Sequence, residues 1–159
     1  MQRLRFFMDL SGNKRLLDGN LIAFFASRTA PPEALNLATR WAQTITQTDN
    51  IVISGFHSPI ERAVLDVLLL NGSSVIVTLG RSLYSKIPLY LQQAYAENRI
   101  LFISFRDISR HSFSNAQLRN CATADLAKES IFAPFDNNSQ LSTLYFSLSQ
   151  VGRCCSILR

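Results

Sequence analysis

Short apolar runs alternate regularly with longer amphipathic stretches along this sequence, and this alternation limits the folds that the chain can adopt. The apolar runs are solid rather than alternating, which is typical of strands buried on both faces of a sheet. Turn-forming pairs separate the two kinds of segment: Ser54-Gly55 ends an apolar run, and Asn71-Gly72 ends an amphipathic stretch. The predicted strands cover residues 21–25, 51–53, 74–78, 100–103, 131–133 and 154–158.

The stretches between these runs have helical spacing. Pro59 is suited to a first helical turn, and Glu61 beside it favours the positive end of the helix dipole. The predicted helices cover residues 32–46, 59–70, 89–97, 115–128 and 141–150. Strands that alternate with helices predict an α/β fold, Rossmann-like and doubly wound, with a mainly parallel sheet of about six strands and helices on both faces. We expect residues 1–159 to form a single domain of this kind.

Composition narrows the class further. The hydrophobic fraction of 47% and the charged fraction of 17% exclude a disordered chain. No apolar run approaches the ~18–20 residues that span a bilayer, and the start of the chain lacks the apolar stretch of a secretory signal. These observations predict a cytoplasmic protein without a membrane partner. Three cysteines and two histidines without metal-ligand spacing predict neither a metal site nor another cofactor.

The net charge of +5 comes from an excess of arginine. The sequence holds 13 Arg and only 3 Lys, and arginine is the preferred residue where a planar group must grip phosphate. An alternative is a bias of composition without a functional role. The charge alone therefore indicates only an attraction to anions.

Small hydroxyl residues, glycine and arginine follow several predicted strands. In doubly wound folds, ligands bind beyond the carboxyl ends of the strands, where free amides at helix N-termini attract anions. We therefore expect a phosphate site at this edge of the sheet, although such residues also cap helices and form tight turns. The residues concerned are Ser27, Arg28, Ser54, Gly55, Gly80, Arg81 and Ser139.

Several segments in series resemble the Rossmann-like core of the DNA-processing protein A family, the bacterial competence factor also called Smf. The order of the segments, which runs over nearly the whole chain, is more specific than any one motif. Residues 22–28 read I-A-F-F-A-S-R where the family has V-A-I-V-G-S-R, and residues 54–61 read S-G-F-H-S-P-I-E where it has S-G-L-A-x-G-I-D. Further matches are G-S-S-V-I-V-T-L-G (72–80), A-E-N-R-I-L-F-I-S (96–104) and R-N-C-A-T-A-D-L-A (119–127).

The resemblance implies binding of single-stranded DNA in a basic pocket, in DNA uptake and recombination, with a recombinase as the partner that receives the strand. Arg28 matches the arginine after the first strand of the family, and Arg119-Asn120 match the start of its R-N-R segment. Ser27 and Ser54-Gly55 match turn residues that face phosphate. Phe56 and Phe113 are candidates for stacking on bases, with packing in the core as the alternative. The family also implies a homodimer.

Departures from the family pattern weaken the expected grip on DNA. Ala26 and Pro59 stand where the family has glycines that permit close backbone approach, and Ser58 and Cys121 replace basic residues. The alternative function is a protein that binds or senses a nucleotide or nucleotide derivative, either non-catalytic or degenerate. The P-G-G-x-G-T-x-x-E motif of phosphoribohydrolases in the same superfamily is missing, so we expect no enzymatic activity, although Glu33 and Glu61 lie near the predicted site.

Overall fold

The computed structural model describes residues 7–105 and 113–159, and the side chains of residues 113–115 lie outside this description. The strands are β1 (Met8–Gly12), β2 (Leu21–Phe25), β3 (Ile51–Ser54), β4 (Val75–Leu79), β5 (Ile100–Phe105), β6 (Glu129–Phe132) and β7 (Cys155–Ile157). The helices are α1 (Ala34–Ile45), α2 (Pro59–Leu70), α3 (Leu89–Ala96), α4 (Phe113–Leu126) and α5 (Gln140–Gln150), with a 3-10 helix at Lys14–Asp18.

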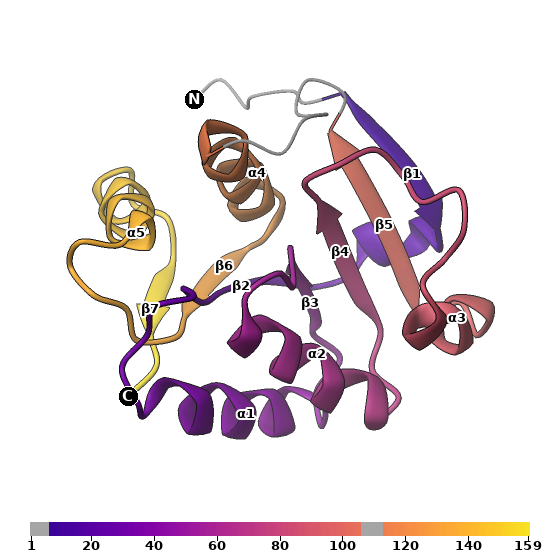
Figure 1. Ribbon diagram of the computed structural model, residues 1–159, viewed down its shortest axis with the longest axis horizontal. Coiled ribbons are helices and arrows are strands. Elements are labelled where there is room, and N and C mark those ends of the chain that lie inside the picture. Colours follow the sequence, from indigo (N-terminus) through magenta and orange to yellow (C-terminus); the bar gives the residue numbers. More distant parts are fainter. Residues whose placement is uncertain (1–6, 106–112) are drawn as a thin grey trace.

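The described strands form one seven-stranded sheet in the order β1-β5-β4-β3-β2-β6-β7 (Figure 1). All neighbours are parallel except β1, which pairs antiparallel with β5 from Met8↔Phe105 to Gly12↔Leu101. The predicted α/β doubly wound class is confirmed. The strand that the sequence did not predict is β1, because an edge strand with half-buried residues lacks a solid apolar run.

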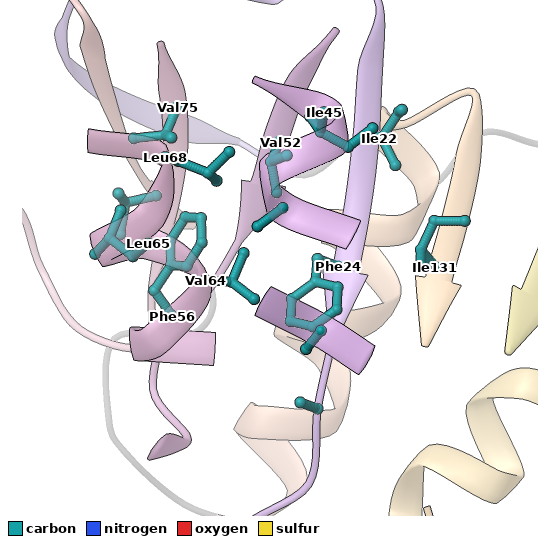
Figure 2. Packing of buried hydrophobic residues seen from close by; sticks show 14 of the residues in the cluster. Ile22, Phe24, Ile45, Val52, Phe56, Val64, Leu65, Leu68, Val75 and Ile131 are labelled. Carbon is teal, nitrogen blue, oxygen red and sulfur yellow. The ribbon is translucent and has the colours of Figure 1, made fainter. Parts of the chain in front are cut away.

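Helices cover both faces of the sheet (Figure 1). Successive residues of β2 alternate between the two faces: Ile22 and Phe24 pack with α1 and α2, whereas Ala23 and Phe25 pack on the side of α4 and α5. Figure 2 shows the first of these clusters, in which Phe24 and Ile22 face Val64 and Ile45. The Phe24 ring also stacks on Trp41 of α1 with ring centroids 5.0 Å apart.

The start of α2 is fixed by reciprocal hydrogen bonds, and it coincides with the first turn that Pro59 and Glu61 indicated. Ser58 is the N-cap, and its Oγ accepts a hydrogen bond from the Glu61 amide at 3.2 Å. Glu61 Oε1 accepts one from the Ser58 amide at 3.1 Å, which completes a capping box with Pro59 at the first helical position. None of the described helices is long and apolar enough to span a membrane.

The connectivity determines where a crevice opens. From β2 the chain proceeds through β3 and β4 to β5 on one side, and then returns to place β6 on the other side of β2. The segments that leave the carboxyl ends of β2 and β6 therefore diverge, which is the switch point at which doubly wound folds bind ligands.

Candidate functional site

A cavity of about 690 Å³ lies at this switch point, beyond the carboxyl ends of the central strands. Its volume is within the range of roughly 300–1,000 Å³ that is typical of small-molecule sites. Four segments far apart in the sequence contribute its lining. These are residues 26–29 after β2, then His57, Ser58 and Glu61 at the start of α2, then Ala116, Arg119 and Asn120 of α4, and residues 138–141 at the start of α5.

Glu61 holds two walls of the cavity together. Its side chain is buried, and Oε2 accepts a hydrogen bond from the Ala26 amide at 3.1 Å after β2. Oε1 accepts hydrogen bonds from the amides of His57 at 2.9 Å and Ser58 at 3.1 Å. Burial raises the pKa of this carboxyl, while the three amides and the charge of Arg119 act in the opposite direction. Glu61 thus links the segment that follows β2 to the start of α2 through hydrogen bonds.

Arg119 supplies a positive charge at the lining of the cavity. It is only 6% exposed, and its Nε and Nη1 have no hydrogen-bond partner among the described residues. Burial lowers the pKa of the guanidinium, and the nearby charge of Glu61 opposes this effect. Buried donors without acceptors are unfavourable, so Nε and Nη1 of this arginine are available to a ligand in the cavity that it lines.

Two features position the Arg119 side chain. One turn further along α4, Thr123 Oγ1 donates to the Arg119 carbonyl at 2.7 Å and contacts Thr78 Oγ1 of β4 at 2.9 Å, which anchors the helix to the sheet. Gly55 provides the space beneath the guanidinium: a Cβ at this position would lie 3.2 Å from both Cζ and Nε of Arg119. The absence of a side chain at Gly55 therefore permits the arginine to lie close to the backbone.

Ser139 is the N-cap residue of α5, but its side chain does not cap the helix. The Ser139 Oγ is buried and lacks a hydrogen-bond partner within the described part of the chain. The first amides of an α-helix have no acceptor inside the helix, and the helix dipole makes this end positive. The hydroxyl and the start of α5 therefore add hydrogen-bond donors to the same cavity that Arg119 lines.

The residues predicted after β2 also reach the cavity. Ser27 Oγ accepts a hydrogen bond from the Thr29 amide at 3.2 Å, which shapes the turn. Arg28 is exposed at the lining of the cavity, and Asn120 of α4 is half-buried there. The structure thus brings together five of the predicted residues: Ser27, Arg28, Arg119, Asn120 and Ser139.

Other predicted residues lie elsewhere. Gly80 and Arg81 follow β4 and are not part of the cavity lining. Arg81 is exposed, its Nε donates to the Ser82 carbonyl at 3.2 Å, and its guanidinium lies 4.6 Å from the centroid of the Tyr84 ring. Ser54 is fully buried, and its Oγ accepts from the Phe56 amide at 3.1 Å, so it shapes the turn that carries Gly55.

The stacking role suggested for Phe56 needs correction. Its side chain is 4% exposed and packs in the core beside Leu65 (Figure 2), because a left-handed backbone conformation with φ of 50° turns it inward. Phe56 therefore packs in the core, which was the alternative to stacking, and its ring is not accessible to a base in this structure. The side chain of Phe113, the other stacking candidate, falls outside the described part of the chain.

The sequence analysis did not predict that Ser58 caps α2, that Thr29 bonds to Ser27, or that Glu61 links the segment after β2 to the start of α2. The S-P-I-E spacing of a capping box is a signal that pointed to Ser58 and Glu61 together. No comparable signal exists for the hydrogen bond from Ala26 to Glu61, since the two residues are brought together only by the packing of α2 on the sheet.

Comparisons with known proteins give matches only at the level of structure, since no family model and no curated protein matches this chain. DNA processing protein A from Helicobacter pylori, described for its single-stranded DNA binding mode, has a TM-score of 0.75 and 17% identity, covering 94% of this chain and 70% of that chain. DNA processing protein A from Streptococcus pneumoniae has a TM-score of 0.65 and 19% identity, covering 94% of this chain. This chain spans 62% of the Streptococcus protein, which is less than two thirds of its length.

A third match is the Moco carrier protein from Chlamydomonas reinhardtii, with a TM-score of 0.55 and 8% identity, covering 88% of this chain and 76% of that chain. At such identities a structural match establishes the fold and leaves the ligand open. The fold agrees with the resemblance found in the sequence. The strand order and the helices on both faces fit a Rossmann-like core, and the two stronger matches each cover 94% of this chain. The chain has the Rossmann-like core fold of DNA processing protein A.

Proposed function

We propose that this protein binds single-stranded DNA and holds a phosphate in the switch-point cavity. The observation that carries the proposal is Arg119, a buried arginine that lines the cavity and whose Nε and Nη1 lack hydrogen-bond partners in the described chain. A phosphate oxygen would supply an acceptor for these two atoms and additional negative charge in one contact.

The surroundings of Arg119 support an anionic ligand. Arg28 adds a second positive charge at the lining of the cavity. Glu61 is the only carboxylate among the described residues of the lining, and both of its oxygens already accept hydrogen bonds from backbone amides. The balance of charge therefore favours an anion over a cation. The likeness to a protein described as binding single-stranded DNA supports the same choice of ligand.

We propose binding without catalysis. A general acid or base must exchange its proton with the ligand. Glu61 is instead occupied by the Ala26, His57 and Ser58 amides, and its hydrogen bonds hold the walls of the site. This arrangement supports a structural role for the carboxylate. The proposal further carries, from the resemblance, a cytoplasmic role in DNA uptake and recombination, a recombinase partner and a homodimer.

Titration with a fluorescent oligothymidylate at several salt concentrations tests the proposal. We expect binding to weaken steeply with salt, and Arg28→Ala to lower the slope of log K against log [salt] by about 0.7, the value for one phosphate contact on a single strand. Arg40→Ala is the matched control, since Arg40 is an exposed residue of α1 that does not line the cavity. Absent or salt-independent binding would contradict the proposal.

A second candidate is a free nucleotide or nucleotide derivative. The observation that favours it is the lining itself, which contains no phenylalanine, tyrosine or tryptophan among the described residues and so offers no such ring for a row of bases to stack on. A mononucleotide at saturating concentration would then raise the melting temperature, with a stabilisation of about 2 kcal/mol at tens of Kd. If the mononucleotide stabilises the protein and the oligonucleotide does not bind, the second candidate replaces the first.

A further inference from the structure

The cavity brings together three kinds of hydrogen-bond donor, namely a guanidinium, a hydroxyl and the amides at the start of a helix. Arg119 contributes Nε and Nη1, and Ser139 contributes its buried Oγ, and none of these atoms has a partner among the described residues. The start of the eleven-residue helix α5 contributes backbone amides next to Ser139. An N-cap serine ordinarily accepts a hydrogen bond from an amide of its own helix. Here the Ser139 hydroxyl does not do so.

The Ser142 amide bonds back to the Ser139 carbonyl at 3.1 Å, which closes the first turn of α5 through the backbone. The amides of Gln140 and Leu141 precede that turn, where a helix supplies no internal acceptor. Both residues line the cavity together with Ser139. The N-terminus of α5 is therefore arranged to donate hydrogen bonds to an external acceptor, and Arg119 from α4 contributes further donors.

The number of donors and the charge distinguish two kinds of phosphate. An internal phosphodiester carries one negative charge and two free oxygens. A terminal phosphomonoester carries roughly −1.5 to −2 at neutral pH and has three free acceptor oxygens. Arg119, Arg28 and the positive end of α5 together exceed the charge of Glu61 by more than one unit.

We infer that the cavity recognises a terminal phosphomonoester of its nucleic-acid ligand, in preference to a phosphodiester within the strand. This inference rests on the proposed binding of single-stranded DNA and adds the part of the strand that enters the cavity. The three oxygens of the terminal phosphate accept from the Arg119 guanidinium, the Ser139 hydroxyl and the first amides of α5, and Arg28 contributes at the exposed side. The same chemistry is present in a nucleoside monophosphate.

The test compares oligothymidylates that differ only at their ends. Strands with a 5′-phosphate, a 3′-phosphate or neither are titrated against the full chain. An unphosphorylated strand two residues longer, which carries the same total charge, serves as the matched ligand. We expect one phosphorylated strand to bind about tenfold more tightly than the charge-matched strand, and the position of its phosphate shows which end enters. Thymidine monophosphate, but not thymidine, is expected to compete for the site.

Two serine variants of α5 show whether the preference arises in the cavity. Ser139→Ala removes the hydroxyl without changing the charge and is expected to reduce the preference for the phosphorylated strand at least threefold, with an unchanged melting temperature. Ser147→Ala, an exposed position on the same helix, is expected to leave the preference intact.

The outcomes separate the inference from the function on which it rests. Equal binding of the phosphorylated and charge-matched strands overturns the inference and leaves the binding of single-stranded DNA in place. A preference that Ser139→Ala does not change also overturns it. A rise in the melting temperature with thymidine monophosphate, but not with thymidine, without binding of any oligonucleotide upholds recognition of a terminal phosphate and overturns the proposed DNA ligand.

Discussion

Two arginines at the carboxyl edge of the sheet differ in how the protein satisfies them. Arg81, after β4, is exposed, donates to the Ser82 carbonyl and lies over the Tyr84 ring. Arg119, on α4, is buried above Gly55, and its Nε and Nη1 are without partners among the described residues. An arginine that already has partners in the protein gains little from a ligand, whereas a buried one whose donors are unpaired is stabilised strongly by an anion.

The two regions also differ in their internal supports. Near Arg81, the Ser104 hydroxyl donates a single hydrogen bond of 2.6 Å to the Arg81 carbonyl. At the cavity, Glu61 accepts three hydrogen bonds from backbone amides of two separate segments. The candidate site is therefore distinguished less by the presence of an arginine than by buried donors that have no partner among the described residues.

The largest expected effect is on stability, from removal of the two supports. Glu61→Ala leaves three amides without their acceptor, so we expect the free energy of unfolding to fall by about 2–4 kcal/mol. Ser104→Ala removes one hydrogen bond and is expected to cost about 1 kcal/mol. Urea denaturation of both variants measures the difference. Equal losses would remove the distinction between the two supports.

The next effect is on binding and compares the two arginines directly. Arg119→Gln is expected to weaken oligothymidylate binding by about 2 kcal/mol, or roughly thirtyfold in Kd, because it removes the charge that faces the phosphate. Arg81→Gln is the matched control and is expected to change binding by less than about 0.5 kcal/mol. Fluorescence titration of both variants measures the change in Kd. A larger effect at Arg81 than at Arg119 would indicate that the ligand binds near the end of β4 and not in the cavity.

A smaller effect is expected from Gly55→Ala. The added methyl group would lie 3.2 Å from Cζ and Nε of Arg119, so the guanidinium must shift, and binding is expected to weaken by about 1 kcal/mol. Because Gly55 acts through Arg119, adding Gly55→Ala to Arg119→Gln should cause no further loss. Independent, additive losses in this double-mutant cycle would show that Gly55 acts in another way.

The smallest effect is a dependence of stability on pH at Glu61. Burial raises the pKa of this carboxyl above its ordinary value of 4.5, so just above that pH the native state holds its proton more firmly than the unfolded state. The stability that Glu61 contributes is therefore greatest below pH 4.5 and decreases as the pH rises from there. The loss caused by Glu61→Ala should shrink over this range, whereas the loss caused by Ser104→Ala should stay constant. A loss at Glu61 that grows with pH would contradict the direction of the shift.

Most of the fold could be predicted from the sequence because buried parallel strands and their helices leave strong local signals. The run at 21–25 coincides with β2, and Pro59 marks the start of α2. The antiparallel strand β1 was missed, since an edge strand is defined by its pairing with β5 rather than by its own apolar pattern.

The candidate site was predicted less completely. The resemblance to a family indicated Arg28 and Arg119, and the rule of carboxyl ends indicated Ser27 and Ser139. The same rule also selected Gly80 and Arg81, which lie outside the cavity lining, because every parallel strand ends at that edge. Phe56 was a candidate for stacking on bases, but its backbone has a positive φ and its ring packs in the core.

Local sequence patterns predicted the class of the fold, and they indicated the carboxyl edge of the sheet, with its arginine and serine residues, as the candidate site for an anion. Which of these residues meet depends on how distant segments pack together. Burial and the absence of a hydrogen-bond partner depend on neighbours from distant segments, here α4 above the turn at Gly55 and α5 beside it. No local pattern encodes an arginine that is buried but left unsatisfied, since that property arises when the surrounding segments pack together.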